Sequence, residues 1–294
     1  MALTVTQLHP LFVAQIDGAD LTQPFTPESF APIQAAMDEH AVLVFKGPTL
    51  TQEQQIDFAR NFGTLEGDSI LKTNIKQRIA PQLADISNLD EENKVLGQQD
   101  RRRMFALGNQ LWHTDSSFKR IPAKYSGLHA HSVTPEGGET QIADNRAAYD
   151  ALPQKIKEQI EDLVAEHSIF CSRQKLGFTE FTDEERAAMP PVHRPLVRIH
   201  PATGRKAIYI ASHASHILGM EIPDGKMLLR ELIEHCTQRE FIYTHTWEVG
   251  DLVIWDNRCT LHRGRPYDEA NHRRDMRRAT VMDDDPAMEH RSAA

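Results

Sequence analysis

The stretch Phe241-Ile-Tyr-Thr-His-Thr-Trp-Glu-Val-Gly-Asp-Leu-Val-Ile-Trp255 contains two short runs of strand-like sequence. The first run covers Phe241–Trp247 and the second covers Leu252–Trp255, with a turn at Val249-Gly-Asp251 between them. Runs rich in β-branched and aromatic residues, bounded by turn residues, are typical of short antiparallel strands. We therefore interpret this stretch as two strands linked by the turn.

Similar runs recur through the second half of the chain. They are Tyr125–His131, Thr140–Ala143, Pro195–His200, Lys206–Ile210 and Ala279–Met282. The segment Pro201-Ala-Thr-Gly-Arg205 is expected to join two of them as a hairpin. Two helical patterns, Ile156–Val164 and Leu228–Cys236, interrupt the strands. Many short antiparallel strands with few helices predict a sandwich or jelly roll that carries helices on its outside.

The first third of the chain mixes two helices with one strand. Thr26-Pro27-Glu28 has the cap, first-turn proline and first-turn acid that begin a helix. Ala41–Phe45 is entirely apolar and predicts a buried strand, and Thr51–Phe62 predicts a second helix that stops at Gly63.

The segment Ile70–Leu107 is polar and charged, and we expect irregular structure there with one strand near Leu83–Ile86. A loop of this length inside a compact protein is usually functional. No linker or repeat divides the chain, so we expect a single domain over residues 1–294 with an active-site lid within residues 66–107.

Composition and charge exclude several classes of protein. The 294 residues are 40 % hydrophobic and 26 % charged, as in ordinary folded proteins. A net charge of −9 argues against general affinity for nucleic acid or anionic membranes. Three widely spaced cysteines without a CxxC motif suit a reducing compartment. With no apolar run long enough to span a bilayer and no secretion signal, we expect a cytoplasmic protein.

Among the fifteen histidines, His113 has the most specific surroundings. Residues two apart on an extended segment point the same way, so His113 and Asp115 can offer a nitrogen and an oxygen to one ion. His262, just after a strand, would complete a triad of two histidines and one carboxylate. Such a triad suits Fe(II) because it leaves three coordination positions open. The alternative is a polar turn capped by Asp115. We expect structural roles for His129, His131, His213 and His216.

Two arginines follow His262 at even spacing. Arg274 and Arg278 share a side whether the segment is a helical turn or a strand. The planar guanidinium binds carboxylates through two parallel hydrogen bonds. Two arginines would therefore suit two anions, the distal carboxylate of a co-substrate and the carboxylate of a substrate.

Several motifs together resemble the TauD/TfdA family of Fe(II)/2-oxoglutarate-dependent dioxygenases. They are Leu8-His-Pro-Leu-Phe12, Asp57-Phe-Ala-Arg-Asn-Phe-Gly63, Asn109-Gln-Leu-Trp-His-Thr-Asp-Ser-Ser117, Thr237-Gln-Arg-Glu-Phe241, Trp255-Asp-Asn-Arg-Cys259 and Arg277-Arg-Ala-Thr280. The similarity runs over almost the whole chain and is greatest to members that act on 2,4-dichlorophenoxyacetate. It implies a mainly β fold with α decorations, the double-stranded β-helix (jelly roll).

The resemblance also implies roles for individual residues. His113, Asp115 and His262 match the iron ligands of the family. Thr140 and Arg274 match the pair that holds the distal carboxylate of 2-oxoglutarate. The substrate side is matched by Arg278 for the anion, Asn109 for the pocket wall and Lys72, whose local match is offset, for the carboxylate.

The implied reaction is hydroxylation of the ether-side carbon of an aryloxyacetate, which then yields a phenol and glyoxylate. It consumes 2-oxoglutarate and O2, produces succinate and CO2, and takes ascorbate as a stimulant. The expected partner is a small aryloxyalkanoate, and we expect a homo-oligomer. Three alternatives remain open: the same chemistry on taurine or another sulfonate or carboxylate, a zinc hydrolase, and a non-catalytic metal-binding jelly roll.

Overall fold

The apolar run at residues 41–45 forms a strand that is buried on both faces. In the computed structural model, which describes residues 3–67, 78–97 and 100–283, this strand is β3 (Val42–Phe45). Because side chains alternate along a strand, Val42 and Val44 pack toward one hydrophobic cluster and Leu43 and Phe45 toward another. The strand therefore lies between two apolar layers, as its sequence predicts.

β3 belongs to a seven-stranded sheet with the order β1-β2-β3-β13-β5-β15-β4. Its neighbours pair antiparallel, except that β2 and β3 are parallel. The other strands of this sheet are β1 (Thr4–Gln7), β2 (Ala14–Asp17), β13 (Leu252–Asp256), β5 (Ala123–Ser132), β15 (Asp275–Met282) and β4 (Leu83–Asp85).

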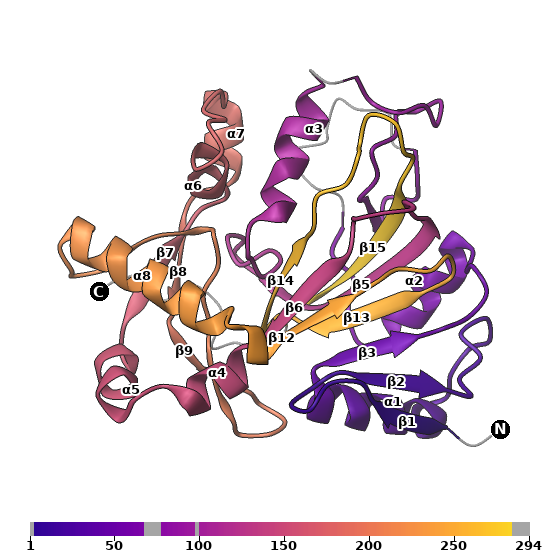
Figure 1. Ribbon diagram of the computed structural model, residues 1–294, viewed down its shortest axis with the longest axis horizontal. Helices are drawn as coiled ribbons and strands as arrows, with labels where there is room; N and C mark the ends of the chain where they lie inside the picture. The colour runs from indigo at the N-terminus through magenta and orange to yellow at the C-terminus, as the bar shows by residue number, and fades with distance from the viewer. Residues whose placement is uncertain (1–2, 68–77, 98–99, 284–294) are drawn as a thin grey trace.

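A three-stranded antiparallel sheet faces the large one (Figure 1). It consists of β12 (Ile242–His245), β6 (Thr140–Asp144) and β14 (Thr260–Gly264). Ile142 of the small sheet packs with Leu128, Val253 and Trp255 of the large sheet in one buried cluster. The two sheets with their shared core form the double-stranded β-helix that the sequence predicts.

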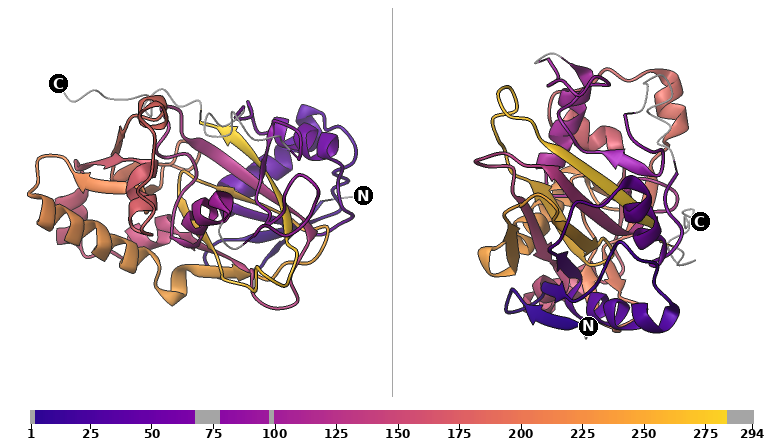
Figure 2. Two further views of the ribbon diagram at one scale, coloured as in Figure 1. Left: turned by 90° about the horizontal axis from the view of Figure 1, so that it is seen from above. Right: turned by 90° about the vertical axis from the view of Figure 1, so that its right-hand side faces the viewer.

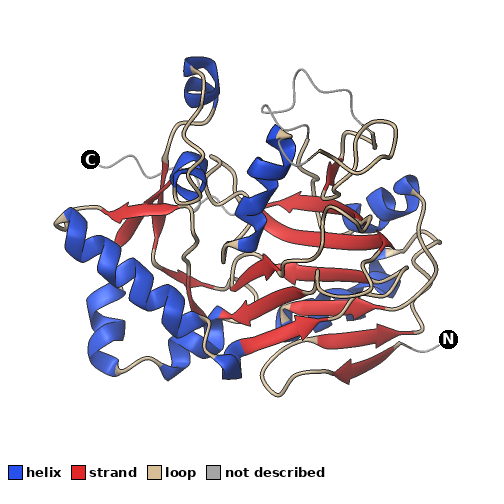
Figure 3. Ribbon diagram, turned by 45° about the horizontal axis from the view of Figure 1, so that its top comes forward, coloured by secondary structure: helices blue, strands red, loops and turns tan. Residues whose placement is uncertain are grey.

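Two N-terminal helices cover the outer face of the large sheet. They are α1 (Pro27–His40) and α2 (Gln52–Arg60), and each begins with a threonine capping box, at Thr26 and Thr51. Phe30 and Phe58 pack with the outward side chains of β3 and β13. In Figure 3 the strands form a central stack of red arrows with the blue helices outside it.

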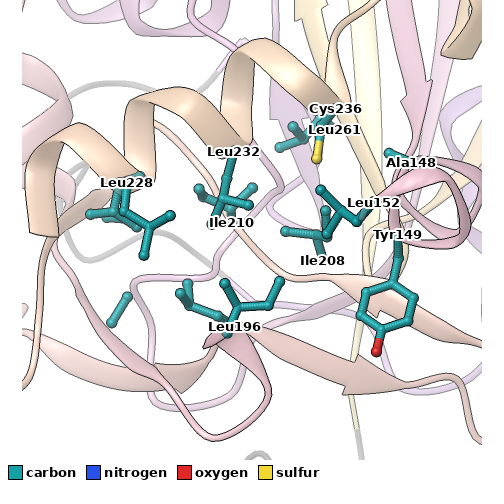
Figure 4. Close-up of a cluster of buried hydrophobic side chains, with 14 of the residues drawn as sticks. Ala148, Tyr149, Leu152, Leu196, Ile208, Ile210, Leu228, Leu232, Cys236 and Leu261 are labelled. Carbon is teal, nitrogen blue, oxygen red and sulfur yellow. The ribbon is translucent and has the colours of Figure 1, made fainter. Parts of the chain in front are cut away.

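A long insertion between β6 and β12 forms the opposite end of the molecule from the N-terminus, as Figure 2 shows in pink and orange. Its longest helix, α8 (Ile222–Cys236), buries Leu228, Leu232 and Cys236 against Leu196 and Leu261 (Figure 4). The other elements of the insertion are α4 (Asn145–Ala151), α5 (Gln154–Ile160), β7 (Val164–His167), α6 (Ile169–Gln174), α7 (Asp183–Ala188), β8 (Val192–Pro195), β9 (Val197–Ile199), β10 (Lys206–Ile208), β11 (Ala214–Ile217) and η3 (Arg239–Phe241).

Several local predictions agree with the structure. β9 and β10 pair antiparallel across the hairpin at residues 201–205, and β4 is the expected strand near Leu83. The cluster of arginines lies on and just before a strand, β15, rather than on a helix. Within the described residues, none of the helices is both long and apolar enough to cross a membrane.

Two local predictions are wrong. The helix expected over Ile156–Val164 ends at Ile160, because Val164 begins β7, which pairs with both β8 and β11. The segment expected to be irregular contains α3 (Arg101–Ala106), capped by Asp100, and the 3-10 helix η2 (Leu107–Gln110).

The turn at Val249-Gly-Asp251 does not close a hairpin. β12 pairs with β6 in the small sheet, whereas β13 pairs with β3 and β5 in the large one. Gly250 has a φ of +94°, and a Cβ on it would lie 2.0 Å from the carbonyl oxygen of Gly47. The turn thus carries the chain from one sheet to the other, in close contact with the segment that follows β3.

Candidate active site

The small sheet brings two of the predicted ligands together. His262 lies in β14, and His113 lies on the segment that extends the sheet beyond it. The two residues exchange both backbone hydrogen bonds, with N···O distances of 3.0 and 2.8 Å. Their ring centroids are 4.1 Å apart, so the two imidazoles lie side by side at the mouth of the barrel.

Asp115 completes the group of three. Its Oδ1 lies 3.8 Å from Nε2 of His113, and its Oδ2 lies 3.5 Å from Nε2 of His262. All three side chains are buried, and their potential ligand atoms lie within 4.8 Å of one another. The spacing His113-x-Asp115 therefore does what the sequence predicts, because both side chains meet His262.

The orientation of His113 is fixed by the backbone. Its Nδ1 lies 2.7 Å from the carbonyl oxygen of Leu111. A carbonyl oxygen only accepts hydrogen bonds, so Nδ1 carries the proton and Nε2 offers its lone pair to the group of three. Such an outer hydrogen bond is a usual feature of metal-binding histidines.

Asp115 is held by two neutral side chains. Ser126 donates a hydrogen bond of 2.7 Å to Oδ2, and Oδ1 of Asn257 accepts one of 3.0 Å from the backbone N–H of Asp115. Nδ2 of Asn257 also donates to Ser126, at 3.0 Å. Asn257 thus supports the carboxylate through two routes.

The electrostatics place all three groups in the form that binds metal. Burial lowers the pKa of His113, and it lowers the pKa of His262 well below its usual value. Burial would raise the pKa of Asp115, but Arg278, the two neighbouring imidazoles and the hydrogen bond from Ser126 together hold that pKa well below its usual range. Two neutral imidazoles and one carboxylate on one face are a donor set that fits Fe(II).

A second buried group, His200, Asp256 and Cys259, has metal-like composition but a different role. Arg258 Nη2 lies 2.6 Å from the carboxylate of Asp256 and 3.1 Å from Nε2 of His200. The guanidinium occupies the position that an ion would take, so this group is a structural charge network.

Arg274 precedes β15 and is fully buried. Its guanidinium donates to the carbonyl oxygens of Gly138 at 3.2 Å and Ile86 at 3.4 Å. No carboxylate among the described residues pairs with it, and burial lowers the pKa of its guanidinium. A buried cation without a counterion is costly, so this position is built to receive an anion.

Thr140 is the second polar group at that position. Its Oγ1 accepts a 3.0 Å hydrogen bond from the indole N–H of Trp247. The hydroxyl proton of Thr140 therefore remains available to a carboxylate oxygen. A cavity of about 120 Å³ contains both residues and reaches the metal ligands; its walls include Thr140, Arg274, His113, His262, Trp255 and Arg278.

A larger cavity of about 360 Å³ opens on the other side of His113 and Asp115. Its walls are mostly apolar and include Leu83, Phe105, Phe118, Ile169 and Met189. Asn109, His113 and Arg278 line both cavities, so the two spaces meet beside His113.

The remaining predicted residues are placed as follows. Arg278 lies against the metal ligand, with Nη1 2.5 Å from Oδ1 of Asp115. Lys72 lies outside the described residues. His213 is not in the metal group; its ring lies 6.0 Å from that of His113, and its Nδ1 lies 3.1 Å from the hydroxyl of Ser172.

Two residues that contact the site are missing from the sequence-based set. Trp247 orients Thr140, and Asn257 supports Asp115. Asn257 lies within the Trp255-Asp-Asn-Arg-Cys259 motif, which was the only available signal for it. No local pattern marks Trp247.

Comparison with known proteins agrees with this geometry. The chain is 50 % identical, over 97 % of its length and 99 % of the relative, to alpha-ketoglutarate-dependent 2,4-dichlorophenoxyacetate dioxygenase of Cupriavidus pinatubonensis. It is 39 % identical to the (S)-phenoxypropionate/alpha-ketoglutarate-dioxygenase of Sphingobium herbicidovorans, over 91 % of both chains. The solved structure of AAD-2 in complex with Mn(II) and N-oxalylglycine matches with a TM-score of 0.90 and 50 % identity, covering 97 % of this chain and 98 % of that one.

The family model described as taurine catabolism dioxygenase TauD, TfdA family, matches residues 4–280, which include every metal ligand and both arginines. The fold agrees with that match, and the predicted ligands His113, Asp115 and His262 lie together within the matched range. The chain belongs to the TauD/TfdA dioxygenase family.

Proposed function

We propose that this protein is an Fe(II)/2-oxoglutarate-dependent dioxygenase that hydroxylates the ether-side carbon of an aryloxyacetate such as 2,4-dichlorophenoxyacetate. The hydroxylated product is a hemiacetal, which collapses to a phenol and glyoxylate. The observation that carries the proposal is a pair of adjoining cavities that share His113. The small one contains Arg274, which has no carboxylate partner among the described residues, and the larger one contains the apolar side chains of Phe105, Phe118 and Met189. The 2,4-dichlorophenoxyacetate dioxygenase relative supports this substrate class.

In this proposal His113, Asp115 and His262 would hold the iron through two imidazole nitrogens and one carboxylate oxygen. The iron, when bound with 2-oxoglutarate, supplies oxidation of a C–H bond by O2, while 2-oxoglutarate becomes succinate and CO2. Arg274 and Thr140 bind the distal carboxylate of 2-oxoglutarate, since they are the cation and hydroxyl that the small cavity offers. The protein thus contributes mainly position.

The larger cavity is proposed to hold the aryl group. Phe105, Phe118 and Met189 provide apolar walls, and Asn109 lies where both cavities meet. Arg278 faces this junction and is the proposed partner of the substrate anion, with Lys72 as a candidate outside the described residues. A space of this size with aromatic and aliphatic side chains in its walls favours an arene over the small, polar taurine.

The decisive experiment is an anaerobic titration with Fe(II) and 2-oxoglutarate, followed through the weak visible charge-transfer band. Addition of 2,4-dichlorophenoxyacetate should shift the band, and air should then release phenol and succinate in equal amounts. Taurine and other sulfonates or carboxylates, tested in parallel, should give neither. A band without a shift, with slow uncoupled succinate, would retain the dioxygenase and reject this substrate. Failure to form the band would favour a metal-binding protein without catalysis.

We also propose that the single domain uses residues 66–107 as a lid. In support, Leu83, Ile86 and Phe105 from the described part of this segment line the larger cavity. Limited proteolysis should cleave the segment more slowly when 2-oxoglutarate and substrate are bound.

We also propose that the protein is a cytoplasmic homo-oligomer that does not bind nucleic acid or membranes. Ile222 and Met227, exposed by 48 % and 61 % on α8, support a homo-oligomer, which sedimentation would test. Three free cysteines support the cytoplasm, and the net charge of −9 argues against binding to nucleic acid or anionic membranes. Ascorbate is proposed as a stimulant of turnover.

A further inference from the structure

Arg173 of α6 is a buried cation in the wall of the larger cavity. Its side chain belongs to a residue that is only 5 % exposed. The guanidinium carbon lies 4.2 Å from the ring centroid of Phe105, and Nη1 donates a 3.0 Å hydrogen bond to the hydroxyl of Ser172. Nε is buried and has no hydrogen-bond partner among the described residues.

The chain makes specific room for this guanidinium at Gly108. A Cβ added to Gly108 would lie 2.0 Å from Nη1 and 2.2 Å from the guanidinium carbon of Arg173. Gly108 has no left-handed φ, so backbone conformation does not require glycine there. Any side chain at position 108 would instead occupy the space of the Arg173 guanidinium.

Arg173 differs from the other arginines that line the larger cavity. Arg78 pairs with Asp85 and Asp275, Arg101 with Glu185, Arg102 with Asp100, and Arg278 with Asp115. Arg173 has no carboxylate partner among the described residues. Burial lowers its pKa to about 10, which still leaves the guanidinium charged at neutral pH.

The position of Arg173 relative to the metal ligands is favourable for a substrate contact. Arg173, His113 and His213 all line the larger cavity. The hydroxyl of Ser172 links Arg173 to His213, whose ring lies 6.0 Å from that of His113. Arg278 is engaged by Asp115 on the other side.

We infer that Arg173 binds the carboxylate of the aryloxyacetate and thereby selects anionic substrates over neutral ones. This inference rests on the proposed function, because it assigns a residue to the substrate side of that site. A carboxylate would give the buried guanidinium its missing counterion. Arg173 would then share the anion with Arg278 or take it while Arg278 stays on Asp115.

The test compares Arg173→Met with the wild-type holoenzyme on 2,4-dichlorophenoxyacetate and on its neutral amide. We expect the KM for the acid to rise about 30-fold or more, as for loss of one partner of a buried charge pair. The KM for 2-oxoglutarate and the affinity for Fe(II) should stay near wild-type. The preference for the acid over the amide should fall by a similar factor.

Arg186→Met is the matched control. Arg186 also stacks near aromatic rings, 5.5 Å from Phe170 and 5.6 Å from Phe181, but it lines neither cavity. It should leave the acid-to-amide preference unchanged. Gly108→Ala, which displaces the guanidinium without removing it, should reproduce part of the Arg173→Met defect.

Folding is checked by the melting temperature of each variant. If Arg173→Met does not fold, Arg173→Lys keeps the charge but loses the planar fork and should still weaken the preference for the acid. If the wild-type enzyme is active and the folded Arg173 variants keep its preference for the acid over the amide, the role of Arg173 is overturned. A wild-type enzyme inactive on the acid would instead overturn the proposed function.

Discussion

The guanidinium of Arg278 and the carboxylate of Asp115 form a charged hydrogen bond of 2.5 Å between Nη1 and Oδ1. One partner is a proposed metal ligand, and the other lies where the two cavities meet. Substitution of either residue should therefore alter both metal binding and substrate binding.

Arg278→Ala should weaken substrate use far more than 2-oxoglutarate binding. Removal of one partner of a buried pair costs about 3–5 kcal/mol, and Arg274 remains to bind the co-substrate. Steady-state KM values for both substrates measure the split. The neighbouring Arg277→Ala is the control, because Arg277 pairs with Asp275 and points to the other face of β15. Earlier loss of 2-oxoglutarate affinity would exchange the roles of the two arginines.

His262→Ala should abolish iron binding and turnover together. The substitution removes one of three donor atoms at the barrel mouth and leaves two, too few for a stable site. Metal content after dialysis and succinate production are the measurements. His216→Ala, which changes a histidine outside the metal group, should retain both. Full activity in His262→Ala would reject the triad.

Asn257→Ala should lower the metal affinity about 10- to 100-fold, as loss of an outer hydrogen bond commonly does. Asn257 supports the backbone of Asp115 and also the hydroxyl of Ser126. Ser126→Ala removes only one of these routes, so its effect should be smaller. Competition with a chelator gives both affinities; equal effects of the two variants would show that Ser126 alone positions the carboxylate.

The adjacent pair of His129, which is buried, and His131, which is half-buried, should make the fold sensitive to acid. Burial, together with the charge of Arg277, lowers the pKa of each to about 4. Nδ1 of His129 lies 3.0 Å from Nε2 of His131, and the backbone N–H of Leu50 donates to Nε2 of His129 at 3.3 Å. The pair is therefore arranged for its neutral form.

Because both folded-state pKa values lie below the unfolded value of about 6.5, stability is full above pH 6.5 and is lost as the pH falls toward 4. The free energy of unfolding should decrease by about 1.4 kcal/mol per pH unit for each histidine over this range. Urea unfolding between pH 7 and pH 4.5 measures the slope. His131→Asn should reduce it, and an unchanged slope would contradict the assignment.

Gly250→Ala should destabilise the fold more than Gly204→Ala. Both glycines have left-handed φ values, +94° and +68°, so alanine is strained at either position. At Gly204 nothing lies within 4 Å of the added Cβ, and the cost should be about 1–2 kcal/mol. At Gly250 the Cβ would also meet the carbonyl oxygen of Gly47. Equal melting temperatures for the two variants would show that the contact is relieved easily.

The parts of the molecule that sequence could predict are those set by local pattern. The apolar run of β3, the threonine caps of α1 and α2, and the alternation that joins His113 to Asp115 all depend on neighbours in the chain. The helix predicted over Ile156–Val164 extends beyond its true end at Ile160, because Val164 takes its strand character from the pairing of β7 with β8 and β11 and not from its own residues.

The residues that sequence missed act through contacts between distant segments. Trp247 reaches Thr140 across the small sheet, and Arg173 reaches Phe105 and Gly108 from the insertion. Neither carries a local signal, because nothing in the residues around it indicates which segment will lie opposite. Resemblance to a family can indicate a residue of this kind only where one of the family motifs contains it, as the motif at residues 255–259 contains Asn257.

The two cavities share Asn109, His113 and Arg278 but differ in the other parts of the chain that line them. The small one contains Thr140 and Trp255 from the two sheets, whereas Ile169, Arg173 and Met189 of the larger one come from the insertion between β6 and β12. Substitutions in the insertion can therefore alter which compound is degraded without disturbing the strands that carry the oxidising centre. Substitutions confined to the insertion could therefore adapt the larger cavity to new substrates. The insertion is the segment in which directed evolution should begin.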